Sequence, residues 1–379
     1  MYTMADNNTL EDCLSYSSNV SDDLVKLWQY SRQDIIVITI IIPIILCLGV
    51  INNSAYLFVI FRVPTMRSAT NICLAHLALA DLLYLTVNSS VFFILKYAAS
   101  PFMKNIDIMK SSPECFIFGF LKNVGYLSSI AIVTTVSFER YLAVCHPIKH
   151  LKIRGQRRTN TMVATCWVMA LVLAFPTTLG TIGFIQKICV VWPEDYKDQF
   201  FSNISYCGPL SFNTETLTIP LTFVIWSFAM VSNVYMYIRI IHTMTKRRSA
   251  NYMRGKDRKA QHSRNKVAQV LIINGVVFFF CQTPSILVDA ILCYHRFNRV
   301  IEDDSFAILH YKNGSWFTHL PLLINAIVNP LIYAIINTQY RSAFIRAFRC
   351  KIGSNQPGDK NILAVSLSLN KSSSHDGRE

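Results

Sequence analysis

The sequence predicts an all-α membrane protein: a bundle of seven transmembrane helices followed by a short amphipathic eighth helix. Three observations support this prediction. First, 52% of the 379 residues are hydrophobic and 15% are charged, whereas soluble globular domains carry about 25% charged residues. Second, the hydrophobic residues form runs long enough for a helix to cross a bilayer, which takes about 20 residues. Third, basic and acidic residues alternate between successive connecting segments.

Seven hydrophobic runs are each long enough to span a bilayer. They cover residues 35–61, 71–95, 115–144, 162–185, 217–241, 267–292 and 317–336. Seven buried helices of a soluble protein would instead need a globule with almost no surface. The predicted parts are an extracellular tail (1–34), the bundle (35–337), a membrane-surface helix (338–350) and a cytoplasmic tail (351–379). The extracellular tail is expected to be mostly disordered and the cytoplasmic tail disordered, and the first run is too long for a cleavable signal peptide.

The net charge of +14 is distributed unevenly along the chain. Lysine and arginine gather after the third, fifth and seventh runs, for example at Lys246, Arg247 and Arg248. Acidic residues gather in the other segments, for example at Glu194 and Asp195. By the positive-inside rule the basic segments are cytoplasmic and the N-terminus lies outside, which we expect to be outside the plasma membrane. The basicity therefore reflects topology and does not indicate nucleic-acid binding.

The segments predicted to lie outside carry two further features. Four asparagines there begin N-x-S/T glycosylation sequons, namely Asn7, Asn19, Asn203 and Asn313. Five cysteines fall on the same side, where disulfides persist, namely Cys13, Cys115, Cys189, Cys207 and Cys293. The agreement between the sequons and the charge distribution supports the predicted orientation.

The residues after the seventh run form a basic amphipathic pattern. Tyr340, Phe344 and Phe348 repeat at four-residue spacing between arginines, which predicts a short helix on the inner membrane surface. Cys350 at its end is a candidate palmitoylation site. The serine-rich tail that follows carries candidate phosphorylation sites, among them Ser366.

Asp81 and Lys122 are ionisable residues inside hydrophobic runs, where charge is costly and marks functional sites. Asp81 in the second run is either a carboxylate held by hydroxyl and amide groups or a cation or proton site. Its candidate partners at similar depth are Asn53, Ser129, Asn325 and Asn329. Lys122 in the outer half of the third run either extends to the membrane surface or points into a cavity and meets an anionic ligand group.

Two short motifs complete the pattern. Glu139-Arg140-Tyr141 ends the third run, and NPLIY, from Asn329 to Tyr333, ends the seventh. Seven runs, an outer N-terminus and both motifs in this order resemble the rhodopsin-like (class A) G-protein-coupled receptors over residues 35–350. The resemblance implies a receptor, not an enzyme, that activates heterotrimeric G proteins and binds arrestin through a phosphorylated tail.

The resemblance also implies roles for individual residues. Arg140 is held by Glu139 at rest and meets the G protein, next to Tyr141. The implied activation residues are Pro220, Ile130 and Phe278 as a transmission triad, Pro284 as a hinge, Asn329 and Pro330 of NPLIY, and Tyr333 as a tyrosine that moves. The implied internal sodium site consists of Asn53, Asp81, Ser129, Asn325 and Asn329. Cys115 is implied to bridge to the second outer loop, and Cys189 is favoured over Cys207, which is expected inside or at the top of the fifth helix.

Departures from the family pattern bear on activation and on the ligand. Gln282 replaces the usual tryptophan, and Phe228 replaces a tyrosine whose hydroxyl helps to hold the active state. Lys122 stands where amine receptors carry an aspartate, and Leu323 stands where an opsin carries its retinal-binding lysine, so neither ligand class is expected.

The loop sequence CVVWPED resembles that of somatostatin-like peptide receptors, and acidic outer loops suit a basic peptide. We therefore expect a neuropeptide ligand, with Lys122 receiving a carboxylate. The predicted ligand-binding residues are Lys122, Asn123, Tyr126, Gln282 and Trp192.

Two alternatives remain open. The same fold could bind a small acidic or lipid ligand. A transporter or channel would show internal repeats, and the sequence shows none. Because no catalytic constellation is present, no enzymatic activity is expected.

Overall fold

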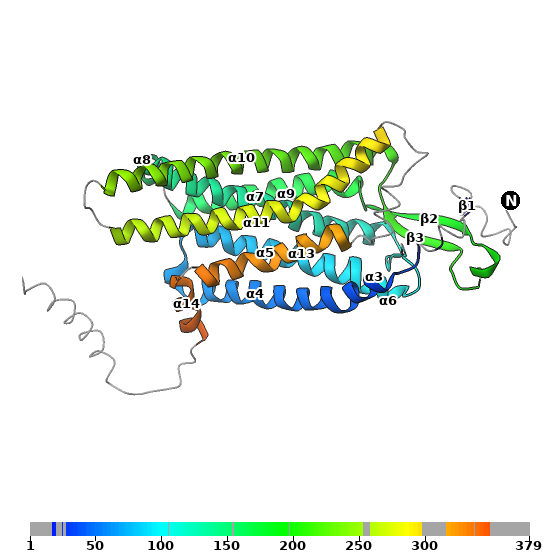
Figure 1. Cartoon of the computed structure of the whole chain (residues 1–379). Coiled ribbons are helices and arrows are strands. Elements are labelled where there is room, and N and C mark those ends of the chain that lie inside the picture. Colours follow the sequence, from blue (N-terminus) through cyan, green and yellow to red (C-terminus); the bar gives the residue numbers. More distant parts are fainter. Residues whose placement is uncertain are drawn as a thin grey trace, which may run out of the picture.

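The computed structural model describes residues 17–19, 25, 28–104, 106–153, 155–196, 198–252, 258–297, 316–336 and 338–348. Long helices lie side by side as an elongated bundle, with a small β-sheet at one end (Figure 1). We call this the hairpin end. Helix α8, helix α14 and the facing tips of α10 and α11 lie at the opposite end (Figure 1).

The bundle helices follow the predicted runs. The first comprises α3 (Arg32–Ile36), a π-helical turn (Val37–Ile41) and α4 (Ile42–Arg62), and the second comprises α5 (Ala69–Ser89), a π-helical turn (Ser90–Leu95) and α6 (Lys96–Ala99). The others are α7 (Ser112–Cys145), α9 (Gln156–Leu179), α10 (Phe212–Tyr252), α11 (Arg258–Phe297) and α13 (Trp316–Ile336). Short 3-10 turns cover Pro64–Met66 and Glu194–Tyr196, and α8 covers Pro147–Ile153.

Six helices in the described part of the chain are long and apolar enough to cross a membrane, and α13 contains the shorter apolar stretch Trp316–Ile332. Large hydrophobic side chains point outward from them: Phe61 is 79% exposed and Phe280 is 78% exposed. Polar residues such as Asp81 and Asn329 lie buried inside instead. This distribution is that of a bundle surrounded by lipid, as the sequence predicts.

Helices α10 and α11 extend beyond the runs predicted for them, 217–241 and 267–292. The structure gives Phe212–Tyr252 and Arg258–Phe297. Hydropathy marks only the apolar part of a helix that lies in the membrane. The additional polar turns continue the same backbone hydrogen bonding beyond that part, so hydropathy does not detect them.

Helix α7 is the centre of the bundle, because α5, α9, α10 and α11 all pack against it. Gly125 permits its close approach to α5, since a Cβ atom there would lie 2.7 Å from the backbone nitrogen of Tyr84. Any larger side chain would push the two helices apart.

Helix α14 (Thr338–Phe348) confirms the predicted amphipathic eighth helix. Tyr340 and Ala343 are buried, whereas Arg341 and Arg346 are exposed. The Tyr340 ring stacks on Tyr56 of α4 with centroids 5.2 Å apart. The predicted apolar stripe therefore attaches this helix to the first transmembrane helix.

A three-stranded sheet at the hairpin end was not predicted. Its order is β1 (Ser17–Asn19), β2 (Phe184–Val191) and β3 (Asn203–Gly208), with β1 parallel to β2 and β2 antiparallel to β3. Within residues 1–34, predicted to be mostly disordered, Ser17–Asn19 pair with β2 and residues 28–34 lead into α3, so the prediction does not hold for these residues (Figure 1). The physical reason is long-range strand pairing, which local composition does not reveal.

Candidate functional site

A small hydrophobic core joins three segments at the hairpin end, and we call it the cap. Its buried members are Val25, Met103, Val190, Trp192, Phe200 and Ile204. The Trp192 ring is 4% exposed and meets Trp28 edge-on at 5.8 Å between centroids. Its indole N–H donates to the Phe201 carbonyl oxygen at 3.0 Å. Trp192 therefore packs within the cap, and its predicted ligand contact stays a prediction.

The cap is fastened to α7 by a disulfide between Cys115 and Cys207, whose Cα atoms are 5.6 Å apart. The prediction that Cys189 pairs with Cys115 is wrong. The strand register explains why: Cys207 faces Ile185 at the base of the hairpin, whereas Cys189 faces Asn203 further along it. Helix α10 begins only at Phe212, so Cys207 is not in the fifth helix.

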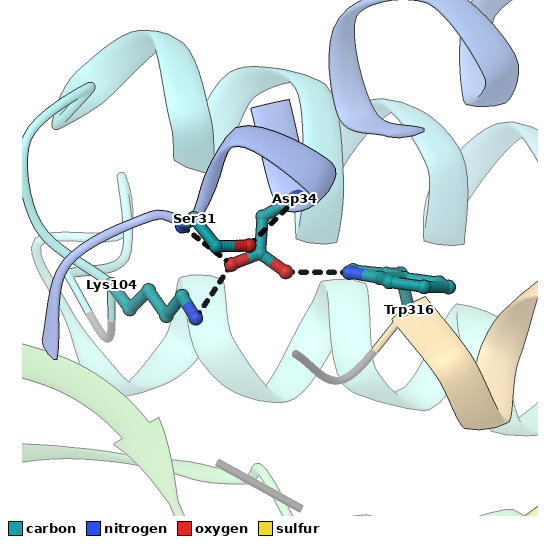
Figure 2. Close-up of polar contacts among 4 residues, drawn as sticks. All are labelled: Ser31, Asp34, Lys104 and Trp316. Atoms are coloured by element: carbon teal, nitrogen blue, oxygen red, sulfur yellow. Dashed lines mark hydrogen bonds and ion pairs between the residues drawn. The ribbon is translucent and has the colours of Figure 1, made fainter. Parts of the chain in front are cut away.

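A buried carboxylate ties the start of the first helix to two other segments (Figure 2). Asp34, which is 1% exposed, forms an ion pair with Lys104 at 2.6 Å and accepts a hydrogen bond from the indole N–H of Trp316 at 2.6 Å. Asp34 and Ser31 also cap each other's backbone N–H groups at the start of α3. These contacts join α3, the loop before α7 and the first turn of α13.

A second acid stabilises the base of the hairpin. Asp107 forms an ion pair with Lys96 at 3.0 Å and accepts a hydrogen bond from the backbone N–H of Cys207 at 2.7 Å. Both carboxylate oxygens of Asp107 therefore have partners. The second helix, the loop before α7 and the disulfide form one unit.

Three of the predicted ligand-binding residues lie between α7 and α11 below the cap. The Tyr126 hydroxyl donates to the side-chain oxygen of Gln282 at 3.4 Å. Lys122, one turn nearer the hairpin end, is half-buried, and its ammonium lies 4.7 Å from the centre of the Phe92 ring. Lys122 thus does not extend to the membrane surface. Asn123 instead donates to Thr178 of α9 at 3.0 Å.

Asp289 joins this group, although the sequence analysis did not select it. It is half-buried on α11, two helical turns from Gln282 toward the hairpin end. Asp289, Asp107 and Lys96 are the charged groups close enough to act on Lys122. The spacing between Asp289 and Gln282 is a sequence feature that could have predicted Asp289 as a site residue, because residues two turns apart share a helix face.

Deeper in the bundle, Asp81 is surrounded by the predicted polar residues. Ser129 donates to one carboxylate oxygen at 2.9 Å, and Asn329 donates to the other at 2.6 Å. Asn53 donates to the carbonyl oxygens of Gly49 and Ala326, each at 2.9 Å. The structure therefore brings together α4, α5, α7 and α13 around one buried carboxylate.

This group offers oxygen atoms to a cation. Within the described residues, the amide oxygens of Asn53, Asn325 and Asn329 are buried and accept no hydrogen bond. A cavity of about 10 Å³ borders Asn53 and Asn329, which is about the space one water occupies. Hard cations prefer oxygen ligands, so the residues fit a small ion such as sodium. No set of three or more His, Cys, Asp or Glu side chains suited to a metal occurs in the described part of the chain.

The residues packed between the Asp81 group and α10 differ from the predicted transmission triad in one member. Ile130 and Phe278 are buried in one cluster, but Pro220 is exposed on α10. The residues of α10 in that cluster are Trp226 and Ala229. The assignment of Pro220 to the triad is wrong. Pro220 lies nearer the hairpin end than Trp226 and Ala229 do, and it is on the lipid-facing side of α10.

The tyrosine that Phe228 was expected to replace is present further along α10. Phe228 is 74% exposed, whereas Tyr237 is buried and its hydroxyl lies 2.8 Å from the Ser137 hydroxyl of α7. Gly275 of α11 gives the Tyr237 ring its space, since a Cβ atom there would overlap the ring. Tyr237 therefore supplies the α10 hydroxyl that was expected to be absent because of Phe228.

At the opposite end, Glu139 and Arg140 lie near the foot of α7. Glu139 is buried, forms an ion pair with Arg158 at 2.8 Å, and lies 3.4 Å from the Nε2 atom of His150. Arg140 donates to the hydroxyl of Thr70 on α5. Tyr141 lies 3.2 Å from the ring nitrogen of His146.

The remaining predicted residues divide by location. Pro284 lies inside α11, Pro330 is buried inside α13, and Asn203 is exposed on β3. The Tyr333, Cys189 and Asn19 side chains and all of Asn7, Asn313 and Cys350 lie outside what the structure describes. Their predicted roles stay predictions.

Comparison with known proteins places the chain among receptors. It is 26% identical to the tachykinin-like peptides receptor 86C of Drosophila melanogaster over 82% of this chain and 58% of that receptor. It is 24% identical to the allatostatin-A receptor of Bombyx mori over 92% of this chain and 90% of that receptor. The blue-sensitive opsin of Gallus gallus is 26% identical over 81% of this chain and 77% of the opsin.

The family profile described as 7 transmembrane receptor (rhodopsin family) matches residues 52–333, most of the bundle. The match includes Asp81, the Glu139-Arg140-Tyr141 motif and the NPLIY motif. It agrees with the seven bundle helices of the structure. The chain therefore belongs to the rhodopsin family of seven-transmembrane receptors.

Proposed function

We propose that this protein is a plasma-membrane receptor that binds an extracellular peptide at its hairpin end and activates a heterotrimeric G protein at its opposite end. The main support for a peptide ligand is that charged residues lie at two depths, on the cap and inside the bundle. Glu194, Asp195 and Asp198 are exposed on the cap, whereas Lys122 lies inside the bundle. A peptide with basic residues and a carboxylate spans both depths, and a small ligand does not. The name of one relative, the tachykinin-like peptides receptor 86C, supports the same ligand class.

The similarity to an opsin does not extend to its ligand. Retinal is held by a lysine of the seventh helix, and the facing residue here is Leu323, which is fully buried. A leucine has no amine to form a Schiff base. The proposal therefore excludes a retinal pigment on the chemistry of α13.

Signalling in this proposal is a shift of population. The peptide prefers a state in which the inner end of α11 has moved outward, and its differential affinity sets the size of the shift. The packed layer of Ile130 and Phe278 transmits the change, with Trp226 and Ala229 on α10. Arg140 leaves Thr70 and contacts the G protein.

Further parts of the proposal follow from the orientation. The hairpin end is extracellular, so Asn7, Asn19, Asn203 and Asn313 are available for glycosylation. Palmitate on Cys350 anchors α14, and a phosphorylated tail binds arrestin.

The proposal is tested by measuring G-protein activation in cells that express the full chain, across a panel of neuropeptides. We expect one peptide to act at nanomolar concentration and Arg140→Ala to abolish the response at unchanged surface expression. A response to small organic acids or lipids, with none to any peptide, would instead identify the small-ligand alternative. If Arg140→Ala keeps both its response to the peptide and its basal activity, coupling to the G protein through this arginine is contradicted.

We also propose that Asp81, Ser129, Asn53, Asn325 and Asn329 hold a sodium ion. The ion would supply a positive charge that neutralises the buried carboxylate. Asp81 would act as its charged ligand and the hydroxyl and amide oxygens as its neutral ligands. The support is the group of amide oxygens described above.

Sodium is expected to raise the melting temperature of the purified receptor by about 3–5 °C relative to N-methylglucamine at equal ionic strength. At ten times its Kd, a bound ion adds about 1.4 kcal/mol of stability. Asp81→Asn should remove the sodium-specific increase, whereas Asp195→Asn, on the exposed cap, should retain it. Equal melting temperatures of the wild type in both salts would refute the site.

A further inference from the structure

Lys122 and Asp289 are opposite charges on facing helices that do not neutralise each other directly. Among the residues that the structure describes, neither forms a hydrogen bond, and neither has an oppositely charged atom within 4.0 Å. The other charges near Lys122 are occupied, because Lys96 and Asp107 are paired at 3.0 Å. Both side chains lie on the hairpin side of the Tyr126–Gln282 hydrogen bond, and the gap between their charged atoms exceeds 4.0 Å.

The surrounding contacts define a site around this gap. Below it, the hydrogen bond between Tyr126 and Gln282 joins the same two helices at 3.4 Å. Beside it, the Lys122 ammonium lies 4.7 Å from the Phe92 ring centre, and Phe92 belongs to the π-helical turn Ser90–Leu95. A π-helical turn often marks a functional site in a helix. A ring face attracts a cation without neutralising its charge.

Burying two charges without neutralisation costs free energy, which a ligand with complementary charges would recover. From these contacts we propose that Lys122 and Asp289 bind one terminal residue of a peptide that carries both a carboxylate and a cationic group. Lys122 takes the carboxylate and Asp289 takes the cation. The inference rests on the proposed peptide ligand and names the end of it that enters the bundle.

The depth of the site favours a chain terminus. Lys122 lies two turns below Cys115, the residue that fastens the cap. A peptide that passed through the site and returned would need room for two strands, whereas a terminus needs room for one. The required chemistry occurs at two kinds of terminus: a C-terminal arginine or lysine with a free carboxylate, or an N-terminal acidic residue with a free α-ammonium.

The test uses small probes on the purified full chain and measures thermal stabilisation as a function of probe concentration. Nα-acetylarginine carries a carboxylate and a guanidinium, and glutamic acid α-amide carries a carboxylate and an α-ammonium. Nα-acetylargininamide and Nα-acetylleucine carry one charge each. We expect one two-charge probe to bind at least tenfold more tightly than both single-charge probes. Whichever two-charge probe binds better identifies the C-terminal or the N-terminal source.

Isosteric neutral variants assign the two charges. Lys122→Gln should abolish the preference for probes with a carboxylate, and Asp289→Asn should abolish the preference for probes with a cation. Lys152→Gln, which removes an exposed charge of α8 at the opposite end, should change neither preference. If a variant does not fold, the comparison of probes on the wild type still decides the matter.

Equal binding of all four probes, or an unchanged preference in both variants, would overturn the two-charge site. The measurement contains no G protein. A failure of peptides to evoke signalling would therefore count against the proposed function and not against this site.

Discussion

Cys207→Ser is expected to lower the surface expression of the receptor as strongly as Cys115→Ser does, and the double variant should be no worse than either single variant. The disulfide between Cys115 and Cys207 is the covalent link between the hairpin and α7, and it closes a loop of 92 residues. Removing a native disulfide typically costs about 2–5 kcal/mol. Surface staining of cells that express each variant measures the effect.

Cys189→Ser is the matched control. Peptide mapping under non-reducing conditions should still recover the Cys115–Cys207 link from this variant. Recovery of a Cys115–Cys189 link from the wild type would show that the strand register of the hairpin is not the one described here. Additive losses in the double variant would show that the two cysteines act independently.

Lys104→Met is expected to destabilise the receptor by about 3–5 kcal/mol, the usual loss when one partner of a buried ion pair is removed. The variant leaves the Asp34 carboxylate buried with only neutral donors, Trp316 and Ser31 (Figure 2). The melting temperature of the purified protein measures the loss. Lys110→Met, an exposed lysine of the same loop, is the control and should have little effect.

The double variant Lys104→Met with Asp34→Leu should recover part of this stability, because it removes the buried charge together with its partner. Some loss should remain, since Trp316 keeps an indole N–H without its acceptor. A Lys104→Met protein as stable as the wild type would mean that the ion pair does not hold α3, the loop and α13 together.

Much of the fold was predictable because a bilayer is a uniform solvent that acts on each segment separately. A helix must satisfy its own backbone in lipid, so the length and polarity of each run determine whether it spans. The seven runs and the amphipathic helix around Tyr340 follow from this rule alone. The same rule identified Asp81 and Lys122, because a charge in an apolar run stands out regardless of its neighbours, and it applies equally to Asp289 in the run 267–292.

Positions along and around each helix were less predictable. Pro220 was assigned to the core because it is the proline of its helix, yet Trp226 and Ala229 fill that layer and Tyr237 supplies the hydroxyl. Hydropathy does not determine how a helix is rotated or how deep it sits, since Phe228 and Tyr237 are both acceptable in an apolar helix. Packing against α7 and α11 makes that choice, and Gly275 is part of it.

Local composition and short motifs suffice to predict the membrane-spanning architecture, the family and the polar groups within the spans. The folded arrangement of the helices is needed to show which groups lie together: Cys115 with Cys207, Asp34 with Lys104 and Trp316, and Asp289 near Lys122. The reason is that spanning depends on the local composition of one segment. Each of these arrangements depends on the register, rotation and depth of two or more segments that are far apart in the chain.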